Sequence, residues 1–168
     1  MKSVLFRVRC LVRRYVRAAV LLYVSFLAAS ASHDTSAAGW SAGAASVVIT
    51  PENPLLIEGY VPAKVAVEKV GDVFVKAFAL RDSTGNRAVI VTADLSGYDY
   101  AFTAAIAKEA EKRFGIPRKA ILFNASHTHS GPGIMPSEWQ LLYGHSPAES
   151  EKVDVYIRWA GERFVKVI

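Results

Sequence analysis

The chain has 168 residues and carries 20 Lys and Arg residues against 15 Asp and Glu residues, a formal net charge of +5. Six of the basic residues and no acidic residue lie in the first 32 positions, so the remainder has 14 basic and 15 acidic residues and a net charge of −1. The basic character therefore belongs to the amino-terminal segment and does not indicate nucleic-acid binding. The only cysteine, Cys10, lies in the same segment, so the rest of the chain depends on its hydrophobic core rather than on disulfides.

Residues 1–32 have the pattern of a secretory signal peptide. Basic residues precede an apolar run from Ala18 to Ala31, and small residues at the end of this run suit cleavage by a signal peptidase. The run has 14 residues and is interrupted by Ser25, which is short against the roughly 20 residues that a membrane-spanning helix needs. We therefore expect a secreted or periplasmic protein, with membrane anchoring by an uncleaved signal as the alternative.

The small and polar residues 33–41 are predicted to form a linker, and residues 42–168 to form one α/β domain. The first strands expected in this domain are short. One covers residues 47–50 and is ended by a proline, and another covers residues 65–68 after a loop that contains two prolines and a glycine.

A hairpin and a strand–helix–strand unit follow. Alternation over residues 72–80, turn-forming residues after them, and the apolar segment 87–93 predict two antiparallel strands. Residues 100–114 have apolar side chains at helical spacing, and residues 120–124 form another buried strand. The continuously apolar stretch 88–91 is typical of a strand that is covered on both faces. These elements predict a layered α/β domain with a mixed sheet.

The last predicted element is a helix. Ser146 is placed to cap it, with Pro147 at the first helical position and Glu149 as the acid of a capping box. Apolar residues then recur at helical spacing, and no stop signal closes the helix before Ile168. We therefore expect an incomplete domain, truncated at the C-terminus, from a longer protein.

Polar residues that can carry chemistry follow the two apolar strands at their carboxyl ends, where ligands collect in α/β units. His127 and His129 are separated by one residue in a loop of Ser, Thr, Gly and Pro. On an extended backbone, residues i and i+2 point to the same side. Two imidazoles that face one point suit a metal ion or an anionic reaction centre. The alternative interpretation is a pair of hydrogen-bonded loop histidines with a structural role.

The other ligands of a metal site are not obvious. Asp94 leaves the preceding strand at the same edge and can orient an imidazole from behind, as carboxylates do behind metal-binding histidines, or can cap the following helix. Asp99 is better placed for that cap. A zinc site generally needs about three or four protein ligands, and the histidine loop supplies at most two. His33 lies in the linker, and His145 is expected at the surface before the last helix.

Three other interpretations are disfavoured. The sequence contains no phosphate-binding glycine loop and no G-x-S-x-G nucleophile elbow. An amidohydrolase barrel with paired histidines at a strand end needs many repeated strand–helix units, and the chain is too short for them.

Residues 125–133 resemble the His-Thr-His-Ser-Gly-Pro signature of the neutral/alkaline (non-lysosomal) ceramidases. Val48 stands where the opening segment of that family usually has an acid. The resemblance covers residues 42–168. Three further segments resemble the family in the same order along the chain: residues 43–51, residues 59–60 and residues 91–95.

The resemblance implies a zinc-dependent amidase that hydrolyses the N-acyl bond of ceramide to sphingosine and fatty acid. In that family the first histidine of the signature binds zinc, which corresponds to His127, and the second faces the substrate and the reaction centre, which corresponds to His129. The glycine of the Gly-Tyr loop lies near the substrate and corresponds to Gly59. Zinc would polarise the amide carbonyl and lower the pKa of a bound water toward about 7. A lipid amide substrate also implies peripheral contact with a membrane.

The remaining zinc ligands of that family (a later histidine, a glutamate and a tyrosine) and its active-site serine lie far downstream and have no counterpart in this chain. We therefore expect a fragment that binds zinc weakly and is incomplete or inactive without a carboxy-terminal portion. The alternative function is an exported non-catalytic binding domain, or a degenerate remnant that keeps the fold.

Overall fold

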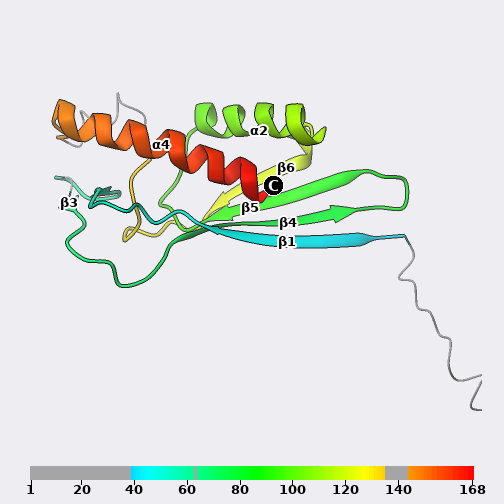
Figure 1. Ribbon diagram of the computed structural model, residues 1–168, viewed down its shortest axis with the longest axis horizontal. Helices are drawn as coiled ribbons and strands as arrows, with labels where there is room; N and C mark the ends of the chain where they lie inside the picture. Colours follow the sequence, from blue (N-terminus) through cyan, green and yellow to red (C-terminus); the bar gives the residue numbers. More distant parts are fainter. Residues whose placement is uncertain (1–38, 63, 135–143) are drawn as a thin grey trace, which may run out of the picture. The chain divides into compact units, whose positions relative to one another are not determined.

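A four-stranded mixed sheet with two helices on one of its faces forms the framework of the domain (Figure 1). The computed structural model describes residues 39–62, 64–134 and 144–168, which belong to one unit. The expected signal peptide, residues 1–32, lies outside the described residues. The predicted α/β class with a mixed sheet is confirmed.

The strands of this sheet lie in the order β1-β4-β5-β6. β1 pairs antiparallel with β4, β4 pairs antiparallel with β5, and β5 pairs parallel with β6. The predicted hairpin and the predicted strand–helix–strand unit are therefore both present. The bounds of the four strands are Ser41–Val48 for β1, Phe74–Arg81 for β4, Arg87–Ala93 for β5 and Ile121–Ala125 for β6.

Two strand predictions near the amino-terminal end of the domain differ from the structure. β1 begins at Ser41, before the predicted start at residue 47. The added residues are small and show no alternation of apolar and polar side chains, so their pairing with β4 leaves no pattern in the sequence. β2 (Leu56–Ile57) lies in a segment predicted as loop and pairs with β3 (Lys64–Val65). A strand of two residues is too short to leave a pattern in the sequence.

The turn between β4 and β5 is organised by one carboxylate. Asp82 accepts hydrogen bonds from the backbone N–H groups of Thr84 and Asn86, both at 2.9 Å, and from both of their side chains. Asp and Asn favour such turns because their short side chains bond the backbone a few residues further on.

The helices begin and end where capping chemistry predicts. α2 (Tyr100–Phe114) joins β5 to β6 and starts at Asp99, whose side chain accepts the N–H of Phe102 at 2.7 Å. It ends at Gly115, which has a left-handed φ of 65°. A short 3-10 turn, Arg118–Ala120, precedes β6.

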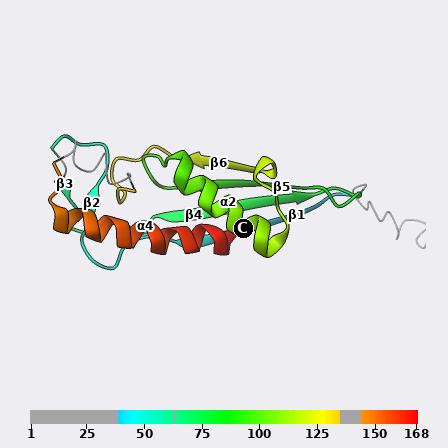
Figure 2. The same ribbon diagram turned by 90° about the horizontal axis from the view of Figure 1, so that it is seen from above.

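The second helix, α4 (Pro147–Val167), starts with the predicted capping box between Ser146 and Glu149. Within the part of the chain that the structure describes, neither this helix nor α2 is both long and apolar enough to span a membrane. Seen from above, both helices lie over the strands (Figure 2).

The core lies between these helices and the sheet. Phe164 of α4 is fully buried and contacts the rings of Phe102 and Tyr98 edge-on. Tyr156 lies eight residues before Phe164 in the same helix and is also buried. Its hydroxyl donates a hydrogen bond to the backbone carbonyl of Ile49 at 2.6 Å. This bond fixes α4 to the segment that follows β1.

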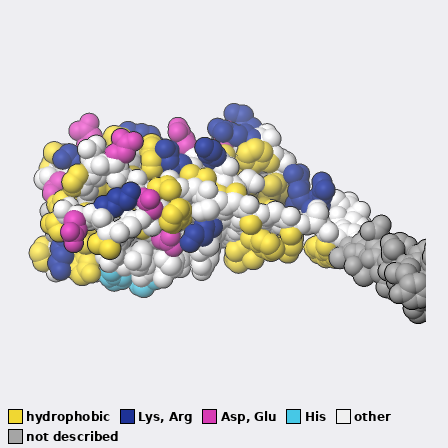
Figure 3. Space-filling model, turned by 60° about the horizontal axis from the view of Figure 1, so that its bottom comes forward, with side chains coloured by type: hydrophobic (Ala, Val, Ile, Leu, Met, Phe, Trp, Pro, Cys, Tyr) yellow, Lys and Arg dark blue, Asp and Glu magenta, His cyan; other side chains and the backbone are white. Residues whose placement is uncertain are grey.

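The opposite face of the sheet is open among the described residues. Val89 and Val91 of β5 point into the core, but Ile90 between them is 44% exposed, and Leu122 of β6 is 60% exposed. The predictions that residues 88–91 are covered on both faces and that residues 120–124 are buried are therefore wrong. The physical reason is that both helices pack on the same side, so hydrophobic side chains remain at the surface of the sheet (Figure 3).

Candidate functional site

Three loops meet at the carboxyl ends of β5 and β6. The two strands end opposite each other, with Ala93 paired to Ala125, so the loops 94–98 and 126–134 leave the same edge. The second loop bonds back to the first strand through the N–H of Ser126 and the carbonyl of Ala93 at 3.0 Å.

The third loop follows β2 and is joined to the histidine loop by backbone groups. The N–H of Gly133 donates to the carbonyl of Leu56 at 2.9 Å, and Ile57 forms an isolated antiparallel bridge with Pro132. These bonds place residues 58–60 beside the two histidines.

The imidazoles of His127 and His129 converge. Their Nε2 atoms are 3.4 Å apart, and their ring centroids are 4.9 Å apart with the planes at 78°. His127 is exposed and His129 is partly buried, and histidine side chains lie at the molecular surface in Figure 3. The pair therefore faces one point that solvent and solutes can reach.

The backbone reaches this arrangement by a route that differs from the predicted one. β6 ends at Ala125, and His127 has a left-handed φ of 60°, so the expected extended backbone across the pair is wrong. Histidine is one of the residues that tolerate this region. The ring is held by a hydrogen bond of 2.7 Å between its Nδ1 atom and the backbone carbonyl of Ser96 in the loop after β5.

This hydrogen bond decides the tautomer of His127. A carbonyl oxygen can only accept, so Nδ1 carries the proton, and the lone pair of a neutral ring is left on Nε2. Nε2 is the atom that faces His129. A ring nitrogen fixed in this way by a carbonyl behind it is the usual arrangement of a metal-binding histidine.

The separation of the two Nε2 atoms fits a shared metal ion. Zinc–nitrogen bonds of about 2.0–2.1 Å in tetrahedral geometry place two ligands roughly 3.3–3.4 Å apart, and the observed separation is 3.4 Å. Among the residues that the structure describes, no three His, Cys, Asp or Glu side chains are placed to hold a metal ion together. The described part of the chain therefore brings two imidazoles together, which is fewer side chains than a zinc site generally needs.

Gly59 lies directly against His129. It has a φ of 91°, and a Cβ atom at this position would lie 2.3 Å from Nδ1 of His129. The next residue, Tyr60, contacts the same imidazole edge-on at 5.9 Å between ring centroids. The structure thus brings together three of the residues singled out in the sequence, namely His127, His129 and Gly59.

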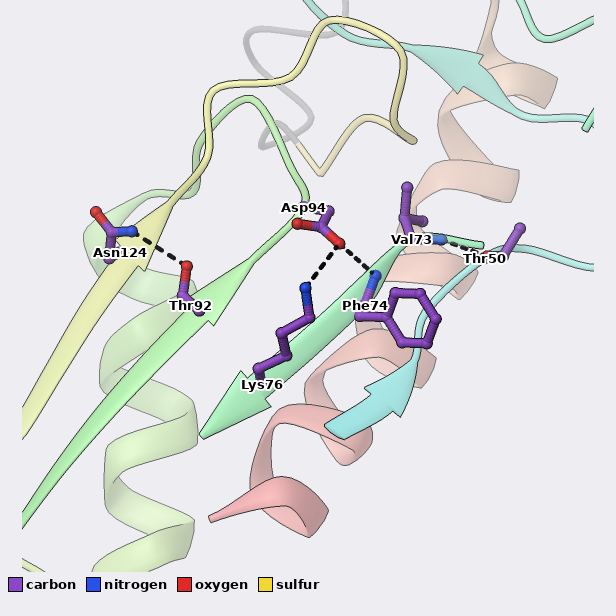
Figure 4. Close-up of polar contacts among 7 residues, drawn as sticks. All are labelled: Thr50, Val73, Phe74, Lys76, Thr92, Asp94 and Asn124. Atoms are coloured by element: carbon purple, nitrogen blue, oxygen red, sulfur yellow. Dashed lines mark hydrogen bonds and ion pairs between the residues drawn. The ribbon is translucent and has the colours of Figure 1, made fainter. Parts of the chain in front are cut away.

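Asp94 is bonded to β4. Its carboxylate accepts the N–H of Phe74 at 3.0 Å and lies 3.7 Å from the ammonium of Lys76 (Figure 4). The orienting role that the sequence suggests for this residue is filled for His127 by the carbonyl of Ser96, and the helix cap is Asp99.

Of the other two histidines, His145 lies just before α4 as predicted, but it is partly buried rather than fully exposed. Burial lowers the pKa of its imidazole. His33 lies outside the described residues.

Glu58 is a site residue that the sequence interpretation missed. The residue is only 7% exposed, and its carboxylate accepts the N–H of Ile134 at 3.4 Å. Burial raises the pKa of this carboxyl group, while the hydrogen bonds and the two nearby imidazoles partly oppose the shift. The sequence gives one indication of this residue, because Glu58 is a single acid directly after the apolar residues 55–57.

The fold and the site together define an α/β protein with two converging histidines at the ends of its parallel strands, the edge at which α/β proteins usually bind ligands. Among solved structures, the chain is similar to a neutral ceramidase from Pseudomonas aeruginosa, with a TM-score of 0.61 and 18% identity over 77% of this chain and 21% of that chain. It is also similar to a ceramidase complexed with C2, with a TM-score of 0.58 and 19% identity over 78% of this chain and 20% of that one.

The chain thus has a ceramidase-like fold and spans about a fifth of the length of these solved chains. A scan against protein-family models and a comparison with curated protein sequences give no match.

Proposed function

We propose that this chain contributes part of the zinc centre of a ceramidase-like amidase, which cleaves the N-acyl bond of a lipid amide such as ceramide. The observation that carries the proposal is the convergence of two imidazoles, with Nε2 atoms 3.4 Å apart, at the carboxyl edge of β5 and β6. The ceramidase-like fold and the resemblance of residues 125–133 to the ceramidase signature support it.

In this function His127 binds the metal through Nε2, because Nδ1 is engaged by the Ser96 carbonyl. When bound, a zinc ion would polarise the amide carbonyl of the substrate and would activate a water molecule as the nucleophile. The imidazole is exposed, so a ligand can approach Nε2 without rearrangement of the loop.

His129 faces the reaction centre and can hold or deliver a proton at Nε2, the atom that points toward His127. Gly59 serves this arrangement by lacking a side chain, since any Cβ atom there would displace the ring. The resemblance to the ceramidases also places this glycine near the substrate.

The proposal has two further parts. The first is that polypeptide outside the described residues completes this site. The second is that the protein is exported through its amino-terminal segment and contacts membranes peripherally. The first statement is supported by the share of the solved ceramidases that the chain spans, about a fifth. The second is supported by the basic and apolar pattern of residues 1–32.

Zinc titration of the full chain, followed by the side-chain NMR signals of the histidines, tests the proposal. We expect weak binding, because a single histidine ligand holds zinc poorly. The binding should shift the signals of both His127 and His129, because their Nε2 atoms are 3.4 Å apart. His127→Ala should abolish the shift of the His129 signal, and His145→Ala, which alters a histidine outside the site, should leave it unchanged.

Two outcomes would contradict the proposal. Zinc that binds equally well to the His127→Ala variant would show that this imidazole is not a ligand. A full chain whose histidine signals do not respond to zinc would favour the alternative function, an exported non-catalytic domain that keeps the fold.

A further inference from the structure

We propose that Glu58 is a positioning residue that keeps the imidazole of His129 turned toward His127. It does so by fixing the backbone of the next residue, Gly59, to the histidine loop, residues 126–134. The first of these two neighbours bonds the loop, and the second packs against the ring. The inference rests on the proposed function only for its consequence at a zinc centre.

The two imidazoles are held in different ways. The ring of His127 is hydrogen-bonded through Nδ1 to the carbonyl of Ser96 at 2.7 Å. Among the described residues, the ring of His129 has one hydrogen-bond contact, which is the Nε2 contact with His127 itself. It also packs against Gly59 and contacts the ring of Tyr60 edge-on. The orientation of His129 therefore depends on the position of these last two residues.

Glu58 joins the segment 58–60 to the histidine loop. Its carboxylate accepts the N–H of Ile134 at 3.4 Å, and its backbone N–H donates to the carbonyl of Gly131 at 3.4 Å. A Cβ atom at Gly133 would lie 3.6 Å from the Cβ atom of Glu58, so the loop packs closely against this residue. Within the described part of the chain, the bond to Ile134 is the one hydrogen bond that a side chain makes between the two segments.

Both residues of this side-chain contact are buried. Glu58 is 7% exposed and Ile134 is 2% exposed. A buried N–H that loses its acceptor is costly unless the backbone moves to find another partner. An ionisable group is likewise costly to bury without compensating hydrogen bonds, and burial raises the pKa of this carboxyl group. Removal of the carboxylate should therefore shift the loop, and not merely empty a small space.

The test is NMR of the full chain without metal, in which nuclear Overhauser effects report the contact between Gly59 and the His129 ring. We expect this contact in the unaltered protein, and its loss together with shifted His129 signals in Glu58→Ala. The Nδ1–H form of His127 should remain, because the Ser96 carbonyl still accepts its proton. A general loosening of the fold would change both rings, so this difference separates a positioning role from a structural one.

Two further variants identify the bond that matters. Glu58→Gln keeps an oxygen that accepts from Ile134 and should preserve the contact between glycine and imidazole. Glu58→Leu fills the buried space without an acceptor and should lose the contact, as Glu58→Ala does. Glu68→Ala, which removes an exposed carboxylate from the same region of the chain, is the matched control and should change neither ring.

Circular dichroism establishes that each variant is folded. An unaltered contact between Gly59 and His129 in folded Glu58→Ala or Glu58→Leu would overturn the inference. A second measurement needs no variant, because the buried N–H of Ile134 should exchange slowly with solvent in the unaltered protein. Fast exchange of this N–H would also overturn the inference.

Zinc titration of the same samples separates this inference from the proposed function. In Glu58→Ala, zinc should still shift the His127 signals, but it should shift the His129 signals less than in the unaltered protein. An equal His129 shift in a variant that has lost the contact with Gly59 would overturn the inference. Histidine signals that do not respond to zinc, while the contact responds as expected, would refute the proposed function and leave the role of Glu58 intact.

Discussion

Gly59 and Gly85 have the same positive φ of 91° but different surroundings. Gly85 has no atom within 4 Å of the place where a Cβ atom would stand, whereas at Gly59 that place lies 2.3 Å from Nδ1 of His129. The first glycine of this pair is therefore needed both for its conformation and for the imidazole beside it.

Alanine substitution separates these two requirements. Both Gly59→Ala and Gly85→Ala should destabilise the fold by roughly 1–2 kcal/mol, because a Cβ atom strains a left-handed backbone. Only Gly59→Ala should also move the His129 imidazole and shift its NMR signals. Urea unfolding and histidine NMR measure the two effects, and unaltered His129 signals in Gly59→Ala would show that the loop adjusts without moving the ring.

At this scale the sequence identifies residues that belong to a pattern and misses those that act through contacts. His127 and His129 share a loop, and Gly59 precedes a tyrosine in a recognisable pair. Ser96 acts through its backbone carbonyl, which every residue possesses, so no residue type could reveal it. Glu58 lies 76 residues from its partner Ile134 and is recognisable only once the chain is folded.

Among the elements, the β4–β5 turn contains a carboxylate, Asp82, whose pKa is strongly lowered. Hydrogen bonds from Asn86 and Thr84 to the carboxylate lower the pKa of Asp82 from 3.8 to about 2. A depressed pKa means that the unfolded chain binds the proton more readily than the folded chain. The stabilisation from this carboxylate is therefore complete above the unfolded value and is lost as the pH falls through about 2.

The Asp82→Asn variant should consequently melt at a lower temperature than the unaltered protein near neutral pH. The difference in melting temperature should shrink as the pH falls from 3.8 toward about 2, where the native carboxylate also becomes protonated. Thermal unfolding across this range provides the measurement. A difference that stays constant with pH would mean that the turn depends on the shape of the side chain and not on its charge.

Elements with a chemical start or stop signal are predictable from the sequence. Asp99 and Gly115 bound α2, and the capping box of Ser146 and Glu149 begins α4, because caps satisfy backbone groups that a helix cannot satisfy itself. β1 lacks such signals. Its small side chains bury little, and its position follows from pairing with β4, a long-range contact that no local pattern records.

For the whole molecule, the asymmetry of the sheet is the main departure from expectation. An apolar strand with a parallel partner suggests cover on both faces, yet α2 and α4 both lie on one side of the sheet (Figure 1). Adjacent residues of β6 show the difference, since Ile121 is 3% exposed and Leu122 is 60% exposed. The pattern of apolar residues in a strand does not by itself show whether helices cover one face of the sheet or both.

Alanine at these two neighbouring positions tests whether the open face is open in solution. Ile121→Ala should destabilise the fold by about 2–5 kcal/mol, as truncation of a buried side chain does. Leu122→Ala should cost about 0.5 kcal/mol or less, as is usual at surface positions. Urea unfolding gives both values, and equal losses would show that a further polypeptide segment or a partner covers this face.

The bonds between the third loop and the histidine loop have a consequence for how the molecule acquires its chemistry. Ser96 lies 31 residues from His127, and Glu58 lies 76 residues from Ile134, so these contacts form only when the chain folds. A site of this kind forms only after the long loops between its residues have closed. An ion captured there would slow amide hydrogen exchange throughout the sheet, and not merely in the segment that touches it.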